Sequence, residues 1–263
     1  MIPKIIHYCW FGGNPLPELA QKCIYSWKKF CPDYEIIEWN ETNFDLSCCE
    51  YVKEAAQAKK WAFVTDYVRL FVMVNYGGIY MDTDVEVLKS LNPYLNNHAF
   101  SGFENSTMIP TGIMASEKGF PLFLQLLNYY HYRHFIKSDG TYDTTTNVII
   151  ITNMCSEHGF VPNDKFQIVD GLALYPHDFF CPKSHDTGEV HLTKNTVTIH
   201  HFSGSWLSKS ERIGRNIKRW FEKENMLLIG KVIAFPFSFY TKIQKFGIIK
   251  TMKWYVHKYI WRK

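Results

Sequence analysis

The sequence predicts an α/β protein with a mixed, mostly parallel sheet flanked by helices, followed by a helical basic tail. Two patterns indicate this class. A strand, a helix and a second strand open the chain, and short apolar runs then alternate with amphipathic segments. The length of 263 residues and the hydrophobic share of 46% suffice for one sizeable core. We therefore expect one main domain over residues 1–224 and a tail over residues 225–263.

The predicted elements follow apolar periodicity and turn residues. Pro17 opens the first helix and Pro32 ends it, and Gly77-Gly78 ends a long second helix. Val85–Val87 is expected to continue the short strand that precedes it. We expect strands at 4–10, 34–39, 79–81, 99–103, 109–115 and 197–201, and helices at 18–30, 50–75, 121–131 and 146–157.

The charges are unevenly distributed along the chain. Residues 225–263 contain eight Lys/Arg and no Asp/Glu, which leaves 21 basic against 25 acidic residues before them. Aromatic residues lie among these lysines, a composition typical of a segment that lies on an anionic membrane surface. The alternative is a solvated helical face packed on the domain. No nucleic-acid-binding motif accompanies the charge, so we expect no nucleic-acid partner.

The cysteines and the N-terminus favour a cytoplasmic protein. The seven cysteines are scattered and include no C-x-x-C pair, which fits reduced thiols better than disulfides or a zinc site. The first residues pass directly into a strand, without the pattern of a secretion signal. No apolar run approaches the ~20 residues needed to span a bilayer. We expect a protein that is peripheral at the inner face of a membrane, while the sequence leaves its oligomeric state open.

Two carboxylates, Asp82 and Asp84, come directly after the short apolar strand 79–81. Hard oxygen donors at a strand end suit Mn²⁺ or Mg²⁺, which can bridge a diphosphate. A D-x-D pair alone is also common in ordinary surface turns. Its sequence context therefore has to decide between the two interpretations.

That context resembles a known enzyme family. Ala62–Leu70 and Tyr76–Asp84 look like the DXD sugar-binding region of glycosyltransferase family 32, which the catalytic domains of large glucosylating toxins share. Ile6–Gly13 resembles the first strand of that family, and His200–Trp206 resembles its closing motif. The similarity covers most of positions 2–90 and 197–206. It implies a GT-A fold, with a Rossmann-like nucleotide half, and makes residues 1–224 the catalytic domain.

The resemblance also implies roles for individual residues at the diphosphate. Asp84 would ligate the metal directly, and Asp82 would contact the ribose or reach the metal through water. His201 falls at the position of a third metal ligand, where the toxins use a carboxylate. Trp206 would donate its indole N–H to the β-phosphate, and Ser205 is a further candidate donor to the diphosphate. His200 is expected to be a structural neighbour.

Three further residues are expected at the donor. Trp10 would stack on the nucleotide base, and Asp66 and Arg69, one helical turn apart, would reach the hydroxyls of the sugar. The simpler alternatives are a core tryptophan and an exposed ion pair. Thr144–Asn147 precedes a helix and is expected to cap it. His177 and Asp178 are weaker candidates for the acceptor site.

We expect a retaining, metal-dependent glycosyltransferase that moves a hexose or N-acetylhexosamine from a nucleotide-sugar, preferably a UDP-sugar. The acceptor would be a glycan or lipid-linked oligosaccharide in the synthesis of bacterial capsule or lipopolysaccharide. One alternative is a nucleotide-sugar- or glycan-binding protein without turnover. Another is a metal-dependent phosphohydrolase, which the absence of an evident dinuclear carboxylate cluster disfavours.

Overall fold

The computed structural model describes residues 1–205, 207–224 and 226–259. By its internal contacts the chain divides into two compact units. The first unit comprises Met1–Lys183 and Val190–Phe202, and the second comprises Ser184–Glu189 and the chain from Ser203 onward. This division falls earlier than the boundary at residue 225 that we expected, because a helix before that residue packs with the helices after it.

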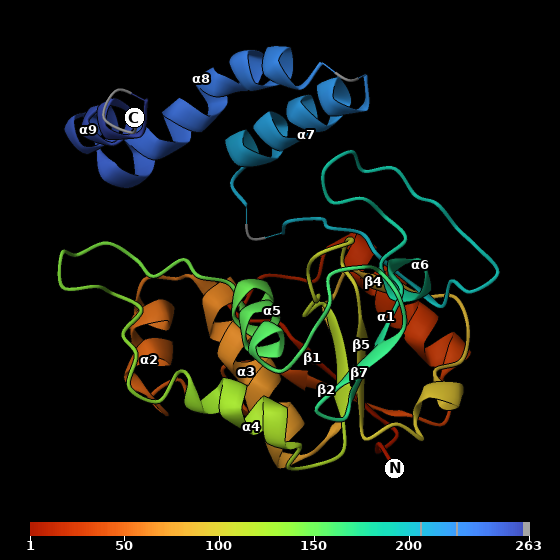
Figure 1. The fold of residues 1–263 in the computed structure, drawn as a ribbon. Coiled ribbons are helices and arrows are strands. Elements are labelled where there is room, and N and C mark those ends of the chain that lie inside the picture. Colours follow the sequence, from red (N-terminus) through yellow and green to blue (C-terminus); the bar gives the residue numbers. More distant parts are fainter. Residues whose placement is uncertain (206, 225, 260–263) are drawn as a thin grey trace. The chain divides into compact units, whose positions relative to one another are not determined.

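The first unit alternates strands and helices along most of its length (Figure 1). A 3₁₀ turn covers Asn92–Tyr94. The strands are β1 Ile5–Cys9, β2 Glu35–Trp39, β3 Gly78–Met81, β4 Val85–Val87, β5 Ala99–Gly102, β6 Ile113–Ser116, β7 Gln167–Val169, β8 Leu172–Tyr175 and β9 Thr198–His200. The helices are α1 Glu18–Phe30, α2 Glu50–Gln57, α3 Trp61–Asn75, α4 Pro121–Asn128, α5 Asn147–Glu157 and α6 His177–Phe180.

Seven strands form the main sheet, in the order β2-β1-β3-β6-β5-β8-β7. β2, β1, β3, β5 and β8 run in one direction, and β6 and β7 run in the other. The expected mixed, mostly parallel sheet with flanking helices is therefore confirmed. Because β1 and β3 are parallel neighbours, the residues that follow them emerge at the same edge of the sheet.

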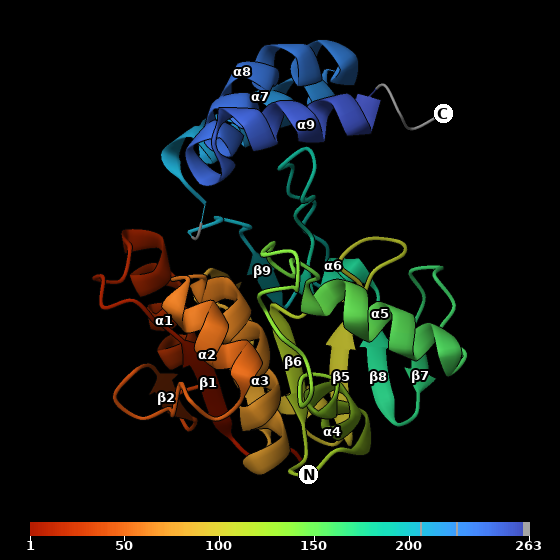
Figure 2. The same cartoon turned by 90° about the vertical axis from the view of Figure 1, so that its left-hand side faces the viewer.

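Alternate residues of the strands fill two cores on opposite faces of the sheet. In β3, Tyr80 belongs to the core under α2, α3, α4 and α5, whereas Ile79 and Met81 belong to the core under α1 and α6. Figure 2 shows the first group of helices in front of the sheet. The fully buried Trp27 of α1 donates its indole N–H to the carbonyl of Val85 at 2.7 Å, and this bond ties the helix to β4. The sheet edge that carries Asp82 is thus supported from both faces.

Two expected elements differ in the structure. The long helix predicted over residues 50–75 is two helices, because Lys59 has a positive φ of 54° that an α-helix cannot contain. Val85–Val87 does not continue β3 but forms a separate two-stranded antiparallel sheet with β9. The chain turns between β3 and β4 through residues 82–84, so the DXD motif lies at this turn.

The second unit is helical. α7 (Lys209–Lys223), α8 (Leu227–Phe246) and α9 (Ile248–Tyr259) follow one another, and α8 contacts both of the others. α7 begins with a capping box in which Ser208 and Glu211 satisfy each other's backbone N–H groups. The helical tail predicted from the sequence is present over its described part. Among the described residues, no helix is long and apolar enough to cross a membrane.

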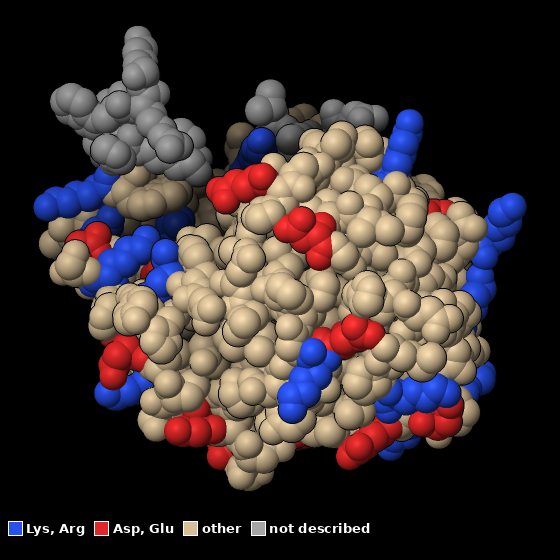
Figure 3. Space-filling model, turned by 60° about the horizontal axis from the view of Figure 1, so that its bottom comes forward, with Lys and Arg blue, Asp and Glu red and all other residues tan. Residues whose placement is uncertain are grey.

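The surface of the first unit bears both signs of charge. On the face shown in Figure 3, acidic and basic side chains lie scattered among uncharged residues, without a large patch of one sign. An electrostatic footprint for nucleic acid would be a continuous basic patch. This face offers none.

Candidate active site

Asp82, Asp84 and His200 meet at the sheet edge after β3. One ligand atom from each residue lies within 4.8 Å of the others. The His200 Nε2 atom is 3.3 Å from Asp84 Oδ1 and 3.9 Å from Asp82 Oδ2. Two carboxylate oxygens and an imidazole nitrogen form a donor set that suits Mn²⁺, with Mg²⁺ favoured less by the nitrogen. The three residues therefore fit a divalent cation.

The antiparallel pairing of β4 with β9 decides which histidine joins the aspartates. Val85 lies opposite His200 in this pairing, and the backbone N–H of His201 donates to the carbonyl of Asp84 at 2.9 Å. Successive side chains of a strand point to opposite faces, so only one of two adjacent histidines can face the cluster. His201 instead lies 2.8 Å from Glu86. The structure thus brings His200, not His201, to Asp82 and Asp84.

The surroundings of His200 leave its ring little freedom to move. The residue is 8% exposed, and its ring lies against Phe202, with a centroid distance of 4.0 Å. Gly112 approaches the other atoms of the ring so closely that a Cβ at this position would lie 2.6 Å from Cε1. Burial lowers the pKa of His200, but the negative charge of Asp84 and the thiol of Cys181 more than reverse this effect and raise it well above the usual value.

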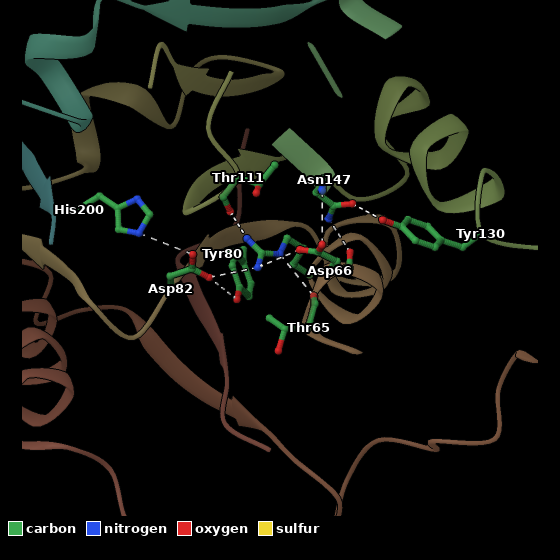
Figure 4. A network of polar contacts seen from close by, with 9 residues as sticks. Thr65, Asp66, Tyr80, Asp82, Thr111, Tyr130, Asn147 and His200 are labelled. Carbon is green, nitrogen blue, oxygen red and sulfur yellow. Dashed lines mark hydrogen bonds and ion pairs between the residues drawn. The ribbon is translucent and has the colours of Figure 1, made fainter. Parts of the chain in front are cut away.

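Arg69 of α3 contacts the Asp82 oxygen that does not face His200. Figure 4 shows Asp82 and His200 with the surrounding polar residues. The Arg69 Nη2 atom is 3.4 Å from Asp82 Oδ1 and 3.3 Å from Asp66 Oδ1, and Nη1 donates to the carbonyl of Thr111 at 2.6 Å. The guanidinium also lies 4.8 Å from the ring centre of Tyr80, whose hydroxyl donates to Asp82 Oδ1 at 2.8 Å. One oxygen of Asp82 is therefore occupied within the protein, while Oδ2 faces His200.

Asp66 connects this network to the start of α5. The Asn147 side-chain amide donates to the backbone carbonyl of Asp66 at 2.6 Å, and its backbone N–H lies 3.4 Å from Asp66 Oδ2. Tyr130 donates to the Asn147 side-chain oxygen. Burial raises the pKa of Asp66 to about 6, against the lowering effect of the positive charge of Arg69. A carboxylate at a helix N-terminus is also favoured by the helix dipole.

The placement of Asp66 and Arg69 differs from a simple surface pair. Their side chains are 11% and 7% exposed, so both are enclosed in the protein rather than free in solvent. Burial lowers the pKa of Arg69, but the negative charges of Asp82 and Asp66 outweigh it and raise the pKa above its usual value. The guanidinium thus remains charged between two carboxylates. Their expected contact with the donor sugar stays a prediction.

The remaining expected residues have the following positions. Trp10 follows β1, is half-buried, and donates its indole N–H to the carbonyl of Asn14 at 2.6 Å. It emerges at the same sheet edge as Asp82, since β1 and β3 are parallel neighbours. Ser205 belongs to the second unit, and Trp206 lies outside the described residues. Asp178 accepts hydrogen bonds from two loop residues, and His177 lies against Asp164, so both have local partners.

Four residues that contribute to the site were not singled out from the sequence for that role. Tyr80 and the carbonyl of Thr111 fix Asp82 and Arg69, Gly112 makes room for the His200 ring, and Asn147 binds Asp66. Two of them gave a sequence signal: Asn147 is part of the expected cap of α5, and Tyr80 lies within the DXD block Tyr76–Asp84. Thr146 is the N-cap residue, yet its side chain makes no capping bond.

Comparison with known proteins agrees with this geometry. Residues 17–101 match the family described as glycosyltransferase sugar-binding region containing DXD motif. This segment of the chain is thus similar to the DXD sugar-binding region of glycosyltransferases. The matched segment contains α3, β3 and the turn with Asp82 and Asp84. This match and the relatives below support the prediction of a glycosyltransferase enzyme.

Two relatives illustrate the range of similarity. Inositol phosphoceramide mannosyltransferase 3 of Schizosaccharomyces pombe is 34% identical over 134 residues, which are 48% of this chain and 36% of that protein. The uncharacterized glycosyltransferase L373 of Acanthamoeba polyphaga mimivirus is 24% identical over 199 residues, 70% of this chain and 77% of that protein. The chain spans about a third of the length of the first relatives it matches.

A solved structure with partial likeness is that of a glycosyltransferase involved in the glycosylation of the major capsid of PBCV-1. It covers 80% of this chain and 97% of its own, with 14% identity and a TM-score of 0.43. A likeness of this size carries no argument about function.

Proposed function

We propose that this protein is a metal-dependent glycosyltransferase that moves a sugar from a nucleotide-sugar to a hydroxyl group of an acceptor. The observation that carries the proposal is the convergence of Asp82, Asp84 and His200 within the DXD region. These three residues would hold a divalent cation. When bound, that cation would neutralise the diphosphate that leaves the donor.

The other residues of the site keep this group in place. Tyr80 and Arg69 engage Asp82 Oδ1, which leaves Oδ2 directed toward His200 and the cation position. Arg69 also contacts Asp66, so its positive charge offsets the repulsion between the buried Asp66 and the partly buried Asp82. Trp10, at the same sheet edge, would contact the nucleotide base. The side chains of the site thus bind and orient the donor.

The finer points of the proposal come from the family resemblance. It favours retention of the anomeric configuration, Mn²⁺, and a UDP-sugar, with no protein side chain acting as a covalent nucleophile. The name of the Schizosaccharomyces pombe relative adds a mannosyl donor and an inositol phosphoceramide acceptor. We propose a glycolipid or lipid-linked glycan acceptor, because the acceptor expected from the sequence and the acceptor in the name of this relative are both lipids or lipid-linked. A role in surface polysaccharide synthesis is the narrower form of this proposal.

The test is a transfer assay with UDP-glucose, UDP-galactose, their N-acetyl forms and GDP-mannose against a panel of glycolipid acceptors, each with Mn²⁺ or with EDTA. We expect a product with a new glycosidic bond that requires the metal and is lost in Asp84→Asn. The matched control is Asp139→Asn, which makes the same change at an exposed aspartate that caps a local turn. Metal-dependent donor binding without product from any acceptor would instead favour the alternative of a nucleotide-sugar-binding protein without turnover.

A further inference from the structure

Helix α8 presents an apolar stripe to solvent. Ile229, Val232, Ile233 and Tyr240 are 49%, 72%, 45% and 57% exposed, and Pro236 is exposed between them. Their spacing of three, four and seven residues places all five on one side of the helix. A soluble helix normally places polar residues on its exposed side. This side of α8 has apolar and aromatic residues instead.

Two other sides of α8 contact the neighbouring helices of the second unit. Ala234 is fully buried, and Thr241 lies 2.7 Å from Ser210 of α7 through the two hydroxyl oxygens. On another side, Phe235 and Phe239 stack on each other and contact Tyr255 of α9 at centroid distances of 5.2 and 5.5 Å. The exposed stripe therefore differs from the sides of α8 that make these contacts. Its later part, Pro236 and Tyr240, borders a groove that Ser210 and Ile213 of α7 also line.

Helix α9 continues the same pattern and adds positive charge. Ile248, Ile249 and Met252 are 60%, 70% and 51% exposed at its start. Lys250 and Lys253 are exposed on the same two turns. No acidic residue occurs between residues 225 and 263, so nothing in this segment offsets its lysines and arginines. Apolar side chains bordered by lysines form the pattern of a helix that lies in a membrane interface.

We propose that the second unit docks on an anionic lipid surface through the exposed apolar side of α8 and the start of α9. The apolar side chains would enter the boundary between headgroups and acyl chains, while Lys231, Lys250 and Lys253 contact lipid phosphates. The positive charge of this segment favours an anionic lipid surface over a second copy of the protein. A second copy of the same acid-free segment would bring two positive surfaces together, whereas anionic headgroups complement it. This inference does not depend on the proposed enzymatic activity.

The test is flotation of the 263-residue protein with vesicles of phosphatidylcholine, with or without phosphatidylglycerol. We expect binding to the mixed vesicles and much weaker binding to the neutral ones. The variant Val232→Ser/Ile233→Ser/Tyr240→Ser should bind at least about tenfold more weakly, and so should Lys231→Gln/Lys250→Gln/Lys253→Gln. All six side chains are exposed, so thermal unfolding should show that both variants remain folded.

Matched controls separate the surface from general effects. Lys28→Gln/Lys118→Gln/Lys165→Gln removes the same net charge from exposed positions of the first unit, and Ile168→Ser removes an apolar residue that is 63% exposed there. Both controls should float like the wild type. The proposal is wrong if the wild type does not float with anionic vesicles or if the serine variant binds as tightly as the wild type. It is also wrong if that variant dissociates an oligomer while vesicle binding is unchanged.

Discussion

Gly112→Ala tests how closely the protein fits around the proposed metal site. The new Cβ would lie 2.6 Å from His200 Cε1, 2.7 Å from Nδ1 and 3.3 Å from Asp82 Oδ2. Ordinary contact begins at 3.4 Å, so the ring would have to move by about 3.4 − 2.6 = 0.8 Å. Metal–ligand distances tolerate about 0.2 Å. A shift of this size should therefore remove His200 from the coordination position.

We expect Gly112→Ala to weaken Mn²⁺ binding about 10- to 100-fold, the range typical of changes that disturb a ligand's support. Overpacking should cost about 1–3 kcal/mol of the free energy of unfolding, which leaves the protein folded. Isothermal titration with Mn²⁺ and urea unfolding measure the two effects. The control is Gly102→Ala, where a Cβ meets the Tyr175 carbonyl at 3.0 Å, away from the cluster. Unchanged Mn²⁺ affinity in a folded Gly112→Ala protein would refute the reasoning.

Three further predictions concern the buried groups. Arg69→Met should lower the free energy of unfolding, measured in urea, by about 3–5 kcal/mol, because it leaves Asp66 and Asp82 without the guanidinium that they share. A loss below about 1 kcal/mol would contradict this prediction. Tyr80→Phe should lower the free energy of unfolding by about 1 kcal/mol and weaken Mn²⁺ binding in calorimetry, because Asp82 loses a hydrogen bond. An Mn²⁺ affinity equal to that of the wild type would argue against a positioning role of Tyr80. Burial lowers the pKa of His7 from 6.5 to about 4, so the unfolded chain takes up a proton at higher pH than the folded protein does. We therefore compare the free energy of unfolding of the wild type with that of His7→Phe as a function of pH. The difference between them should be constant above pH 6.5 and should change by about 3 kcal/mol, to the disadvantage of the wild type, as the pH falls to 4. A difference that does not depend on pH would contradict the neutral, buried state of His7.

The neutral form of His7 follows from its two hydrogen bonds. Trp39 donates its indole N–H to His7 Nδ1 at 3.1 Å, so Nδ1 must accept and Nε2 donates to the carbonyl of Gly77 at 2.9 Å. A proton on Nδ1 would face the indole N–H directly. The bond from Trp39 connects β1 to β2, and the bond to Gly77 connects β1 to the chain after α3. His7 therefore ties β1 to the start of β3 from within the core, at the end of β3 opposite to Asp82.

The sequence predicted the position of the DXD motif well, because local signals define it. The apolar run 79–81 and the glycine pair before it mark a strand that starts after a helix, and the carboxylates follow directly. The parallel pairing of β1 with β3 then explains why Trp10 and Asp82 share one edge. The position of the motif depends on neighbouring residues alone, whereas the pairing of β1 with β3 is a distant contact.

The choice between His200 and His201 could not be made from the sequence. It depends on the register of β4 with β9, two strands more than 100 residues apart in the chain, and a shift of one residue would exchange the two side chains. Spacing also placed Asp66 and Arg69 on one helix face without showing that this face is buried. Their burial results from the packing of Tyr80, Thr111 and α5 around them, which only the fold reveals.

Nucleotide binding tests the central claim most directly. UDP, GDP and UMP would be titrated calorimetrically, with Mn²⁺ or with EDTA, into the wild type, Asp84→Asn and Asp139→Asn. We predict that at least one nucleoside diphosphate binds only with Mn²⁺, and that this binding is lost in Asp84→Asn but kept in Asp139→Asn. Binding that persists in EDTA or in folded Asp84→Asn, or no binding of any nucleotide with Mn²⁺, would contradict a metal-dependent nucleotide-sugar site at Asp82, Asp84 and His200.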